Sequence, residues 1–450
     1  MTIVPLHSEA GQTSVSRNRV AIIGSGISGT SAAWALAKTH DVVIYEAAGR
    51  PGGHTATVDI DYNGTPVAVD TGFIVYNELN YPNLTALFNH LGVRTHASNM
   101  SFSMSLDAGR LEWSGASYTS LFAQKRNVVS LPFLFMLKEI VRFNRICVED
   151  RDSGFTNGKS IGSYLASRNF APRFRDDYLI PMGAAIWSTP RVKMLDFPAD
   201  AFISFFENHR LIHNERPDWR TVSGGSRNYL NRLLITLPGA LRTNRAVTSI
   251  HRSAHKVFVT DVTGATEAFD QAVIACHSDQ ALRLLSDANP LEKKLLGSIT
   301  YRPNRVVLHR DASLMPKRKR AWAAWNYLRS SKPDGEPEVA VTYWMNRLQG
   351  IDEKMPLFIT LNPPREPKAG TVFGEWSYDH PQFDAEALAA QQMLPEIQGR
   401  GHVWFAGAWT GYGFHEDGLR SGLEAAEALG AELPFAISGP TIRRALEAAE

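Results

Sequence analysis

Short apolar runs, separated by glycines and polar residues, open the chain. Val20 to Ile23 is such a run, and Gly24-Ser25-Gly26-Ile27-Ser28-Gly29 follows it directly. The small residues from Ser31 to Leu36 predict a helix, and the run from Asp41 to Tyr45 predicts a second strand that ends at Glu46. A strand, a helix and a strand in this order predict a parallel β-α-β unit.

A hairpin and a helical region are predicted next. The strand-like runs 56–62 and 65–69 flank Asn63-Gly64, a dipeptide typical of tight hairpin turns. From about 80 to 215 the pattern is mostly helical, and the segment from Pro132 to Glu149 carries basic residues opposite an apolar face. The apolar positions of this segment are Phe133, Met136, Leu137, Ile140, Val141 and Phe143.

The second half of the chain alternates between strand and helix patterns. Ser223-Gly224-Gly225 leads into a helix through Leu234, and strand-like runs follow at 246–250, 256–260 and 268–275. The region from about 300 to 375 is β-rich. A last strand at 402–407 precedes a glycine-rich turn and a helix from about 418 to 429.

Composition narrows the class of protein. A length of 450 residues predicts two or three domains. The 47 basic and 45 acidic residues give a net charge of +2, which is too balanced for nucleic acid as a main partner. The two cysteines, Cys147 and Cys276, form neither a disulfide framework nor a metal motif. We expect both to be buried as small hydrophobic residues, in a protein of the reducing cytoplasm.

The sequence predicts no membrane-spanning segment. Residues 1–18 are polar, lack the apolar core of a signal peptide, and are expected to form a flexible tail. The longest apolar stretch, Val128 to Leu137, is well short of the ~20 residues that span a bilayer. We therefore expect a cytoplasmic protein that is soluble or peripheral to the inner face of the membrane.

The glycine motif has the parts of a dinucleotide-binding site. Gly24 allows the tight turn, Gly26 lets the backbone approach a pyrophosphate, and Gly29 lets the helix pack on the strand. The helix N-terminus offers free N–H groups to phosphates. Glu46 is placed to accept hydrogen bonds from a ribose diol, and its charge disfavours NADP.

Five sequence blocks, in order along nearly the whole chain, resemble the flavoprotein superfamily of amine oxidases, phytoene desaturases and protoporphyrinogen oxidases. Residues 409–418, Trp-Thr-Gly-Tyr-Gly-Phe-His-Glu-Asp-Gly, are similar to a bacterial branch often encoded beside cyclopropane-fatty-acid-synthase-like lipid methylases. The flavin-dependent conjugated linoleic acid isomerase is a suggestive relative. The blocks are 24–29 with Glu46, Gly52-Gly53, 223–225, the strand near Val247 with 273–275, and 405–407 with 418–422.

The resemblance implies FAD and an α/β fold. It places a Rossmann-like FAD-binding domain of the glutathione-reductase type at 19–78, 218–298 and 395–440, with an inserted α+β substrate domain at 79–217 and 299–394. The cofactor contacts that motif and resemblance imply are Gly24, Gly26, Ile27, Ser28, Gly29, Glu46, Arg50, Gly52, Gly53, His54, Thr71, Gly72, Phe73, Val247, Gly407, Ala408, Asp417, Gly418, Leu419 and Ser421.

Two positions depart from the superfamily pattern. His54 stands where relatives usually have arginine after the glycine pair, and Ala408 stands where an acidic residue that bonds the ribityl chain is common. The resemblance therefore leaves these two contacts open.

The flavin face is the expected place of the chemistry. We expect Tyr412, Phe414 and His415 beside the ring, with Tyr76 as a weaker candidate; the alternative is core packing for the aromatics and a structural hydrogen bond for His415. Arg305 lies roughly where amine oxidases place a lysine near flavin N5, so it is a candidate to hold a carboxylate or anionic flavin; the alternative is a surface arginine.

Other sequence signals bear on the chemistry of the site. Glu416 and Asp417 suit helix capping as well as a site. No metal pattern is present in the sequence.

Two segments indicate a lipid substrate. The helix from Pro132 has the apolar and basic faces of an interfacial helix, and tryptophans and Met315 flank the basic run Lys317–Arg320. An ordinary domain surface and a solvated turn are the alternatives. The sequence thus predicts an FAD-dependent oxidoreductase that desaturates, oxidises or isomerises a fatty acyl chain, free or in phospholipid. A flavin amine oxidase, or a non-catalytic FAD-binding partner of a lipid methylase, stays open.

Overall fold

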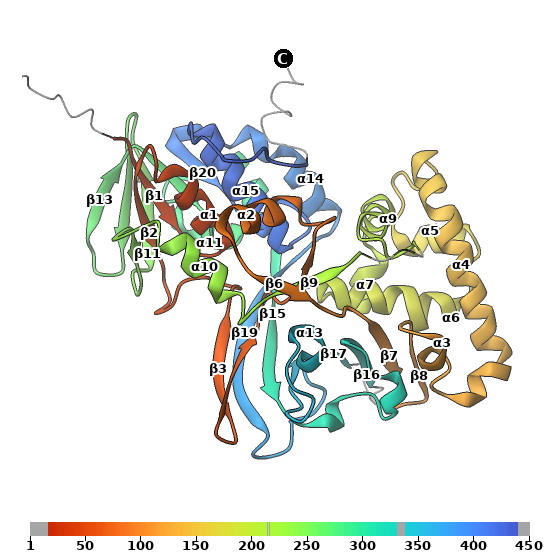
Figure 1. Ribbon diagram of the computed structural model, residues 1–450. Coiled ribbons are helices and arrows are strands. Elements are labelled where there is room, and N and C mark those ends of the chain that lie inside the picture. Colours follow the sequence, from red (N-terminus) through yellow and green to blue (C-terminus); the bar gives the residue numbers. More distant parts are fainter. Residues whose placement is uncertain (1–16, 214, 216, 331–337, 440–450) are drawn as a thin grey trace, which may run out of the picture.

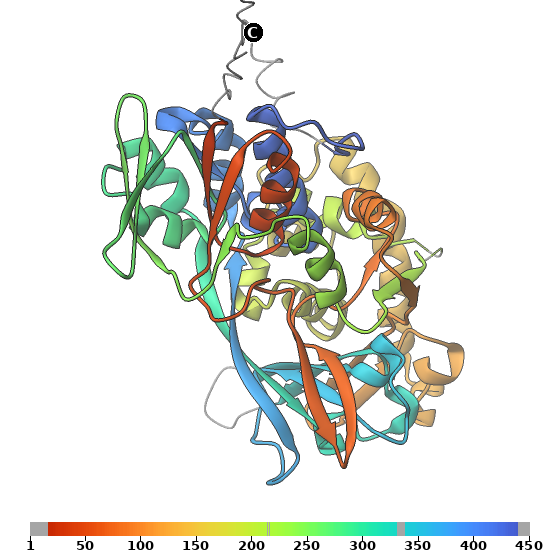
Figure 2. The ribbon, with the colours of Figure 1, turned by 60° about the vertical axis from the view of Figure 1, so that its left-hand side comes forward.

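The computed structural model describes residues 17–213, 215, 217–330 and 338–439. Figures 1 and 2 show a β-α-β layered part, a helical part on the opposite side, and a second sheet beneath them. Apart from its last two residues, the predicted tail 1–18 lies outside the described residues.

A parallel five-stranded sheet forms the first layer. Its strand order is β10-β2-β1-β14-β20, and Ile23 of β1 pairs with Tyr45 and Ile274 on either side. The predicted β-α-β unit is present: α1 (Ile27–Leu36) connects β1 to β2. The strands are β1 (Arg19–Ile23), β2 (Asp41–Tyr45), β10 (Leu241–Arg242), β14 (Gln271–Ile274) and β20 (Val403–Phe405).

Alternation along β1 explains how both faces of this sheet are covered. Val20 and Ile22 join one apolar core, whereas Ala21 and Ile23 join another. Helix α1 is buried along its whole length between the sheet and α15. The helices of the first core are α1, α2 (Pro82–Leu91), α10 (Arg227–Leu234) and α15 (His415–Ala428).

A small antiparallel sheet and three helices cover the other face. The strands predicted near 246, 256 and 268 are β11 (Val247–Arg252), β12 (Val257–Asp261) and the pair β13 (Thr266–Phe269) and β14. The helices are α11 (Ser278–Leu284), α12 (Pro290–Gly297) and α14 (Ala385–Met393), and the short 3-10 turns beside β20 are η5 (Leu394–Glu396), η6 (Arg400–His402) and η7 (Ala408–Thr410).

A seven-stranded mixed sheet forms the second layer, in the order β19-β15-β18-β17-β16-β7-β8. Its longest strands, β15 and β19, pair antiparallel and run from this sheet toward the parallel one (Figure 2). The strands are β7 (Phe102–Leu106), β8 (Leu111–Ser114), β15 (Thr300–His309), β16 (Trp325–Ser330), β17 (Glu338–Trp344), β18 (Phe358–Leu361) and β19 (Val372–Gln382), with η3 (Ala312–Leu314), η4 (Lys319–Ala321) and α13 (Met345–Gln349) in the connections.

The region predicted to be mostly helical is more mixed than its pattern indicates. Strands occupy part of 95–114 because these residues pair with β9 (Trp219–Val222) and β16, partners that lie more than 100 residues away. The helices that follow are α3 (Tyr118–Leu121), η1 (Lys125–Val129), α4 (Leu131–Asp152), α5 (Ile161–Ser167), α6 (Pro172–Phe174), η2 (Arg175–Leu179), α7 (Ile180–Trp187), α8 (Arg191–Leu195) and α9 (Ala199–Asn208).

Two short sheets link the layers. The predicted hairpin is present as β3 (Thr57–Tyr62) and β4 (Thr65–Asp70), with positive φ at Asn63 and Gly64 as its turn requires. The second short sheet consists of β5 (Tyr76–Asn77), β9 (Trp219–Val222) and β6 (Thr95–Ala97). All strands of the parallel sheet come from 19–78, 218–298 and 395–440, the segments predicted for the FAD-binding domain. We propose the division into two domains on this basis.

Candidate functional site

A cavity opens at the carboxyl ends of four parallel strands. Its volume is about 880 Å³. Gly24 follows β1, Glu46 follows β2, Cys276 follows β14 and Gly407 follows β20, and all four residues line the cavity. Ligands of open α/β sheets bind in a crevice at this edge. The second sheet and the helical part close the other side, so the glycine motif and the predicted substrate part face one continuous space.

The glycine motif leaves room where a pyrophosphate is expected. A Cβ built on Gly26 meets no atom within 4 Å, and Gly53 lies next to the Gly26 backbone. A Cβ on Gly29 would lie 1.9 Å from the carbonyl oxygen of Gly24, so that glycine serves close packing. Ser25, Ile27 and Ser28 line the cavity at the N-terminus of α1. This open cradle fits a phosphate group.

Glu46 lies at the end of β2, where a ribose diol is expected. Its carboxylate accepts hydrogen bonds from the backbone N–H of Ser25 (3.0 Å) and of Ala48 (2.8 Å) and from the Ser25 hydroxyl. Val247, at the start of β11, lines the same end of the cavity. Arg50 is exposed and donates to the Gly53 carbonyl oxygen at 3.0 Å, so it braces the second glycine loop, and it is not among the lining residues.

The C-terminal block supports the cavity more than it lines it. Gly407 and Ala408 line the cavity, whereas the Asp417 carboxylate accepts hydrogen bonds from the backbone N–H of Tyr412 and of Phe414, both at 3.0 Å. The Ser421 hydroxyl accepts one from the Gly407 N–H at 2.9 Å. Gly418 packs on α1, Leu419 is fully buried, and neither touches the cavity. Asp417, Gly418, Leu419 and Ser421 therefore hold the C-terminal loop in shape and do not line the cavity.

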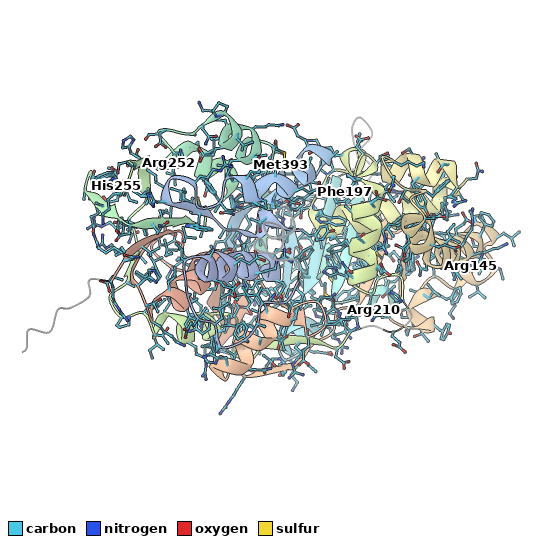
Figure 3. The ribbon with its side chains drawn as sticks, turned by 90° about the horizontal axis from the view of Figure 1, so that it is seen from above. Arg145, Phe197, Arg210, Arg252, His255 and Met393 are labelled. Atoms are coloured by element: carbon cyan, nitrogen blue, oxygen red, sulfur yellow. The ribbon has the colours of Figure 1, made fainter. Side chains whose placement is uncertain are left out.

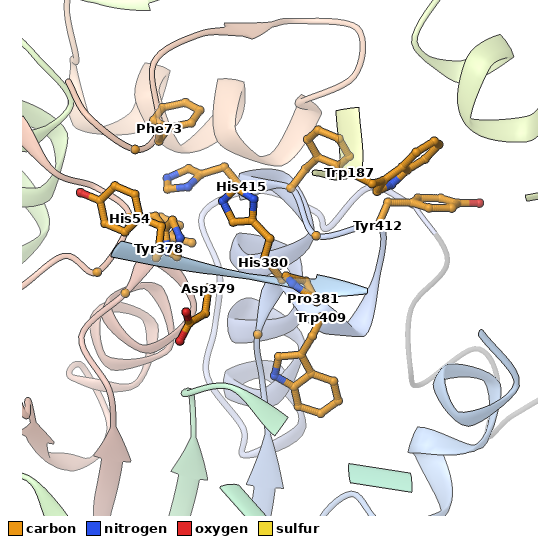
Figure 4. A pocket seen from close by; sticks show the side chains of 18 of the residues that line it. His54, Phe73, Trp187, Tyr378, Asp379, His380, Pro381, Trp409, Tyr412 and His415 are labelled. Carbon is orange, nitrogen blue, oxygen red and sulfur yellow. The ribbon is translucent and has the colours of Figure 1, made fainter. Parts of the chain in front are cut away.

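His415 lies in the cavity wall, and its place beside a flavin ring stays a prediction. Its ring stacks on Phe73 with 3.9 Å between centroids (Figure 4). Its Nε2 shares a hydrogen bond with the Tyr229 hydroxyl at 2.6 Å. Burial lowers the pKa of His415 to about 3. The imidazole is therefore neutral at physiological pH and cannot act there as a proton donor through an imidazolium.

His54 and the Thr71-Gly72-Phe73 turn form the adjoining wall. Gly72 packs on the His54 backbone, where a Cβ would lie 2.2 Å from its carbonyl oxygen. Burial lowers the pKa of His54 to about 3, and its buried Nε2 has no hydrogen-bond partner among the described residues. Buried polar atoms normally have a hydrogen-bond partner. A bound group that supplies a partner for the His54 Nε2 therefore fits this cavity wall.

Residues of β19, which the motif analysis did not single out, complete this wall. The Tyr378 hydroxyl shares a 2.8 Å hydrogen bond with the Thr71 hydroxyl, and its ring lies 4.9 Å from that of His54. His380 shares a 3.0 Å hydrogen bond with the Ser188 hydroxyl, and burial lowers its pKa to about 4. The alternation of aromatic rings at Trp376, Tyr378 and His380 was the only signal in the sequence.

A second group of aromatic residues joins the C-terminal loop to the helical part. The Phe205 ring of α9 lies 5.7 Å from Tyr412, 5.2 Å from Phe414 and 3.8 Å from His209. All four side chains line the cavity. Both readings of Tyr412 and Phe414, ring neighbour and packing residue, agree with this position. Phe205 and His209 were not predicted because they are distant in sequence from every motif.

Arg305 lies away from the cavity, contrary to its candidate role. Its guanidinium forms ion pairs with Glu366 and Glu375 on the surface, and its neighbour Val306 lines the cavity. Successive side chains of a strand point to opposite faces. Arg305 is therefore the surface arginine that was the alternative interpretation.

Three further residues, Tyr76, Cys276 and Met315, lie in other surroundings than the sequence predicted. Tyr76 is buried among Tyr81 and Phe88 and does not line the cavity. Cys147 is buried as expected, but Cys276 is only partly buried and lines the cavity, where burial raises the pKa of its thiol to about 12. Met315 is buried, so it does not flank the basic run as an exposed apolar residue.

The described residues hold no group of three or more histidine, cysteine, aspartate or glutamate side chains that could bind a metal ion. Over the same residues, no helix is both long and apolar enough to cross a membrane.

The sequence profile of a family described as flavin containing amine oxidoreductase matches residues 27–430. Solved structures similar to this one include a cyclohexylamine oxidase from Brevibacterium oxydans, at 16% identity with a TM-score of 0.66 over 92% of this chain and 98% of that one. A CLA-producing fatty acid isomerase from P. acnes has 15% identity and a TM-score of 0.62, over 92% and 98%. A putrescine oxidase double mutant has 16% identity and a TM-score of 0.65, over 93% and 100%. No curated protein matches the sequence at a significant level.

Proposed function

The chain belongs to the family of flavin-containing amine oxidoreductases and is an FAD-dependent oxidoreductase, and from that premise we propose that its substrate is a fatty acyl chain, free or phospholipid-bound. The reaction is desaturation, oxidation or isomerisation. The observation that carries the proposal is the chemistry of the cavity beyond the flavin-facing wall, which is apolar and includes Arg210, an arginine without an ion pair among the described residues.

Aromatic and aliphatic side chains of both the second sheet and the helical part enclose this end of the cavity. Such a wall accepts an extended hydrocarbon and excludes water. The lining residues include Met100, Phe102, Trp113, Met182, Ile186, Trp187, Val306, Trp325, Tyr343, Ile359 and Leu361.

The charged lining residues favour an anionic substrate over a small amine. The acidic lining residues in the described part of the chain are Glu46, at the ribose position, and Asp379. Figure 4 shows Asp379 on the side of β19 opposite to Tyr378 and His380. Arg210 also lines the cavity, and a fixed positive charge there repels an ammonium group.

Arg210 is the residue that we infer to hold the carboxylate or phosphate of the substrate. It is half-buried directly after α9, on the half of the molecule that carries Arg145 and Phe197, and away from Arg252 and His255 (Figure 3). Within the described part of the chain its guanidinium has neither a hydrogen bond nor an ion pair, and its fork of N–H donors matches a carboxylate or phosphate.

FAD, when bound, supplies an acceptor for a hydride, that is, for one proton and two electrons. The remaining roles belong to the chain. Arg210 fixes the anionic end of the substrate, the aromatic wall excludes water, and neutral His380 can take up the proton that a desaturation releases. With FAD bound, the redox change would balance in either reaction: in an isomerisation the hydride would return to another carbon of the substrate, and in a desaturation the electron pair would pass on to dioxygen or another acceptor.

Anaerobic absorption spectra of the holoprotein test the substrate class. We expect unsaturated fatty acids or host phospholipids to bleach the oxidised-flavin band, or to be isomerised without bleaching, as product analysis would reveal. Simple amines are the comparison. Bleaching by amines alone would contradict the acyl substrate and favour an amine oxidase. Bound flavin with neither bleaching nor product from lipid would favour an accessory role beside a lipid methylase.

The variant Arg210→Gln tests the anchor. Loss of a charge-assisted hydrogen bond costs about 1.5–3 kcal/mol, so we expect KM for a free fatty acid to rise roughly 10- to 100-fold with a smaller change in kcat. Arg210→Lys keeps the charge and should recover part of the loss. Arg305→Gln removes a surface arginine outside the cavity and is the matched control. An unchanged KM in Arg210→Gln would remove this residue from the site.

A further inference from the structure

Exposed apolar side chains gather at the start of α4 and in the turns before it. Val129 is 80% exposed, Leu131 78% and Phe135 51%, whereas folded proteins rarely leave several large apolar side chains together in water. We call this group the docking face. Its members are Tyr118, Val128, Val129, Leu131, Leu134 and Phe135.

The docking face is separate from the packing face of the same helix. Phe133, Met136 and Phe143 of α4 are fully buried, and Phe133 packs on Phe122 and Trp113. The core of the helical part is thus complete without the docking face. The predicted apolar stripe was only partly correct, because Val141, expected among the buried positions, is 68% exposed.

The surroundings of the docking face are basic. Lys125, Arg126 and Lys138 are exposed within it, and the sequence has no acidic residue between Glu112 and Glu139. Both of these glutamates are buried: Glu112 accepts from Arg318, and Glu139 pairs with Arg142.

The fold adds a second basic segment to the same region. The turn η4 overlaps the exposed run Lys317–Arg320 and packs against β8 and against α3, whose first residue, Tyr118, belongs to the docking face. Asp107, directly after β7, and Asp177 of η2 are both paired with Arg110 and Arg329. The two segments that separately indicated lipid are therefore neighbours in space (Figure 1, around α3 and the lower end of α4).

We propose that this face docks on the surface of an anionic lipid bilayer. Apolar side chains enter the interface between head groups and acyl chains, and the surrounding lysines and arginines bind the anionic head groups. A protein partner is the less favoured occupant, since the positive charge is spread over several segments around the face with no unpaired carboxylate among the residues named.

The docking face adjoins the cavity. Gly115 is exposed and lines the cavity, and it lies three residues before Tyr118. Trp113 lines the cavity and packs on Phe133 of α4, with 6.4 Å between ring centroids. A docked bilayer would thus contact the part of the molecule that walls the apolar end of the cavity. The proposal goes beyond the proposed function, because docking requires no turnover.

Vesicle flotation of the holoprotein tests the proposal. We expect binding to vesicles of phosphatidylcholine mixed with phosphatidylglycerol, little binding to phosphatidylcholine alone, and a decline as salt is added. The double variant Val129→Asp/Leu131→Asp should weaken binding by roughly ten-fold or more, a change that corresponds to ~1.4 kcal/mol. Lys125→Glu/Lys138→Glu should weaken it by a similar factor.

Ile235→Asp is the matched control, since Ile235 is 81% exposed at the end of α10 and belongs to the other part of the molecule. It should bind vesicles like the wild type. Bound flavin and turnover of a dispersed substrate should be unchanged in all variants, which separates loss of docking from loss of folding or function. The proposal would be overturned if the wild-type protein did not bind anionic vesicles. It would also be overturned if the Val129→Asp/Leu131→Asp and Lys125→Glu/Lys138→Glu variants bound them as the wild type does. A dimer that Leu131→Asp breaks, without vesicle binding, would assign the face to a second copy of the chain.

Discussion

Gly26 and Gly29 belong to one motif but are glycines for different reasons. Gly26 faces open space in the cavity, whereas Gly29 lies against the Gly24 carbonyl oxygen in the packing of α1 on β1. A side chain at position 26 would therefore occupy the ligand's place and leave the fold intact. A side chain at position 29 would collide with backbone and disturb the fold itself.

We predict that Gly26→Val yields folded protein without FAD. The backbone at Gly26 is extended (φ −65°, ψ −178°), which any residue adopts, so only the space for the pyrophosphate is lost. The ratio of flavin to protein absorbance after purification, with circular dichroism for the fold, measures the effect. Gly297→Val, at an exposed helix end, is the matched control and should keep its flavin. Normal flavin content in Gly26→Val would contradict the assignment of the cradle.

At the scale of elements, α15 holds the flavin-side loop by its first turn. The helix begins at His415, three residues before the predicted start, because Asp417 accepts the N–H groups of Tyr412 and Phe414. Glu416 accepts the N–H groups of Asn83 (2.8 Å) and Leu84 (3.0 Å) and so ties α15 to the start of α2. The two acidic residues therefore serve the helix ends, which was one of the readings of the sequence.

We predict that Glu416→Ala destabilises the protein by about 2–4 kcal/mol, because two buried backbone N–H groups and the Asn83 amide lose their acceptor. Glu416→Gln keeps one carbonyl oxygen and should lose less. Denaturation midpoints in urea measure both variants. Glu427→Ala removes a carboxylate of the same helix that makes no side-chain hydrogen bond within the described residues, and it should unfold like the wild type. Equal denaturation midpoints for Glu416→Ala and Glu427→Ala would contradict the role of Glu416 in joining α15 to α2.

At the scale of the whole molecule, buried ionisable groups set the response to pH. Burial holds five histidines neutral: the pKa of His54 and His415 falls to about 3, and that of His209, His309 and His380 to about 4. The unfolded chain takes up these protons near pH ~6.5. Below that pH the unfolded state binds more protons than the native state, and the native state loses stability as the pH falls.

Four buried carboxyl groups act in the opposite direction. Burial raises the pKa of Asp70 to about 6, that of Glu416 and Glu424 to about 7, and that of Asp417 above its usual range, so the stability they contribute is present at low pH and is lost as the pH rises through the raised pKa values. The five histidines outweigh these four carboxyl groups in the window between about pH 6.5 and pH 4.

We therefore predict that the melting temperature of the apoprotein falls between pH 7 and pH 5. Thermal unfolding at constant ionic strength measures it. His309→Gln removes one histidine outside the cavity and should make the dependence shallower, while His255→Gln, on the exposed end of the β11–β13 sheet, should not. A melting temperature that rises on acidification would show that the carboxyl groups outweigh the histidines and would contradict the prediction.

The sequence by itself determined the parts of this protein whose physics is local. The β-α-β unit, the Asn63-Gly64 hairpin and the glycine cradle depend on residues within a few turns of one another, so periodicity and spacing predict them. The family resemblance predicted FAD as the cofactor, because each block that carries the resemblance is a contiguous stretch of sequence. Glu46, His54 and His415, which lie inside or beside these blocks, line the cavity, and their roles toward a cofactor stay predictions.

Only the tertiary structure decided which distant residues meet. Arg305 differs from Val306 by one position on a strand, and the pleat turns one outward and the other into the cavity. Arg210, Tyr378 and His380 carry no motif, and they reach the cavity only because β19 and the end of α9 pack against the cradle. Whether an apolar side chain is core or docking face likewise depends on what covers it, and no local pattern contains that information.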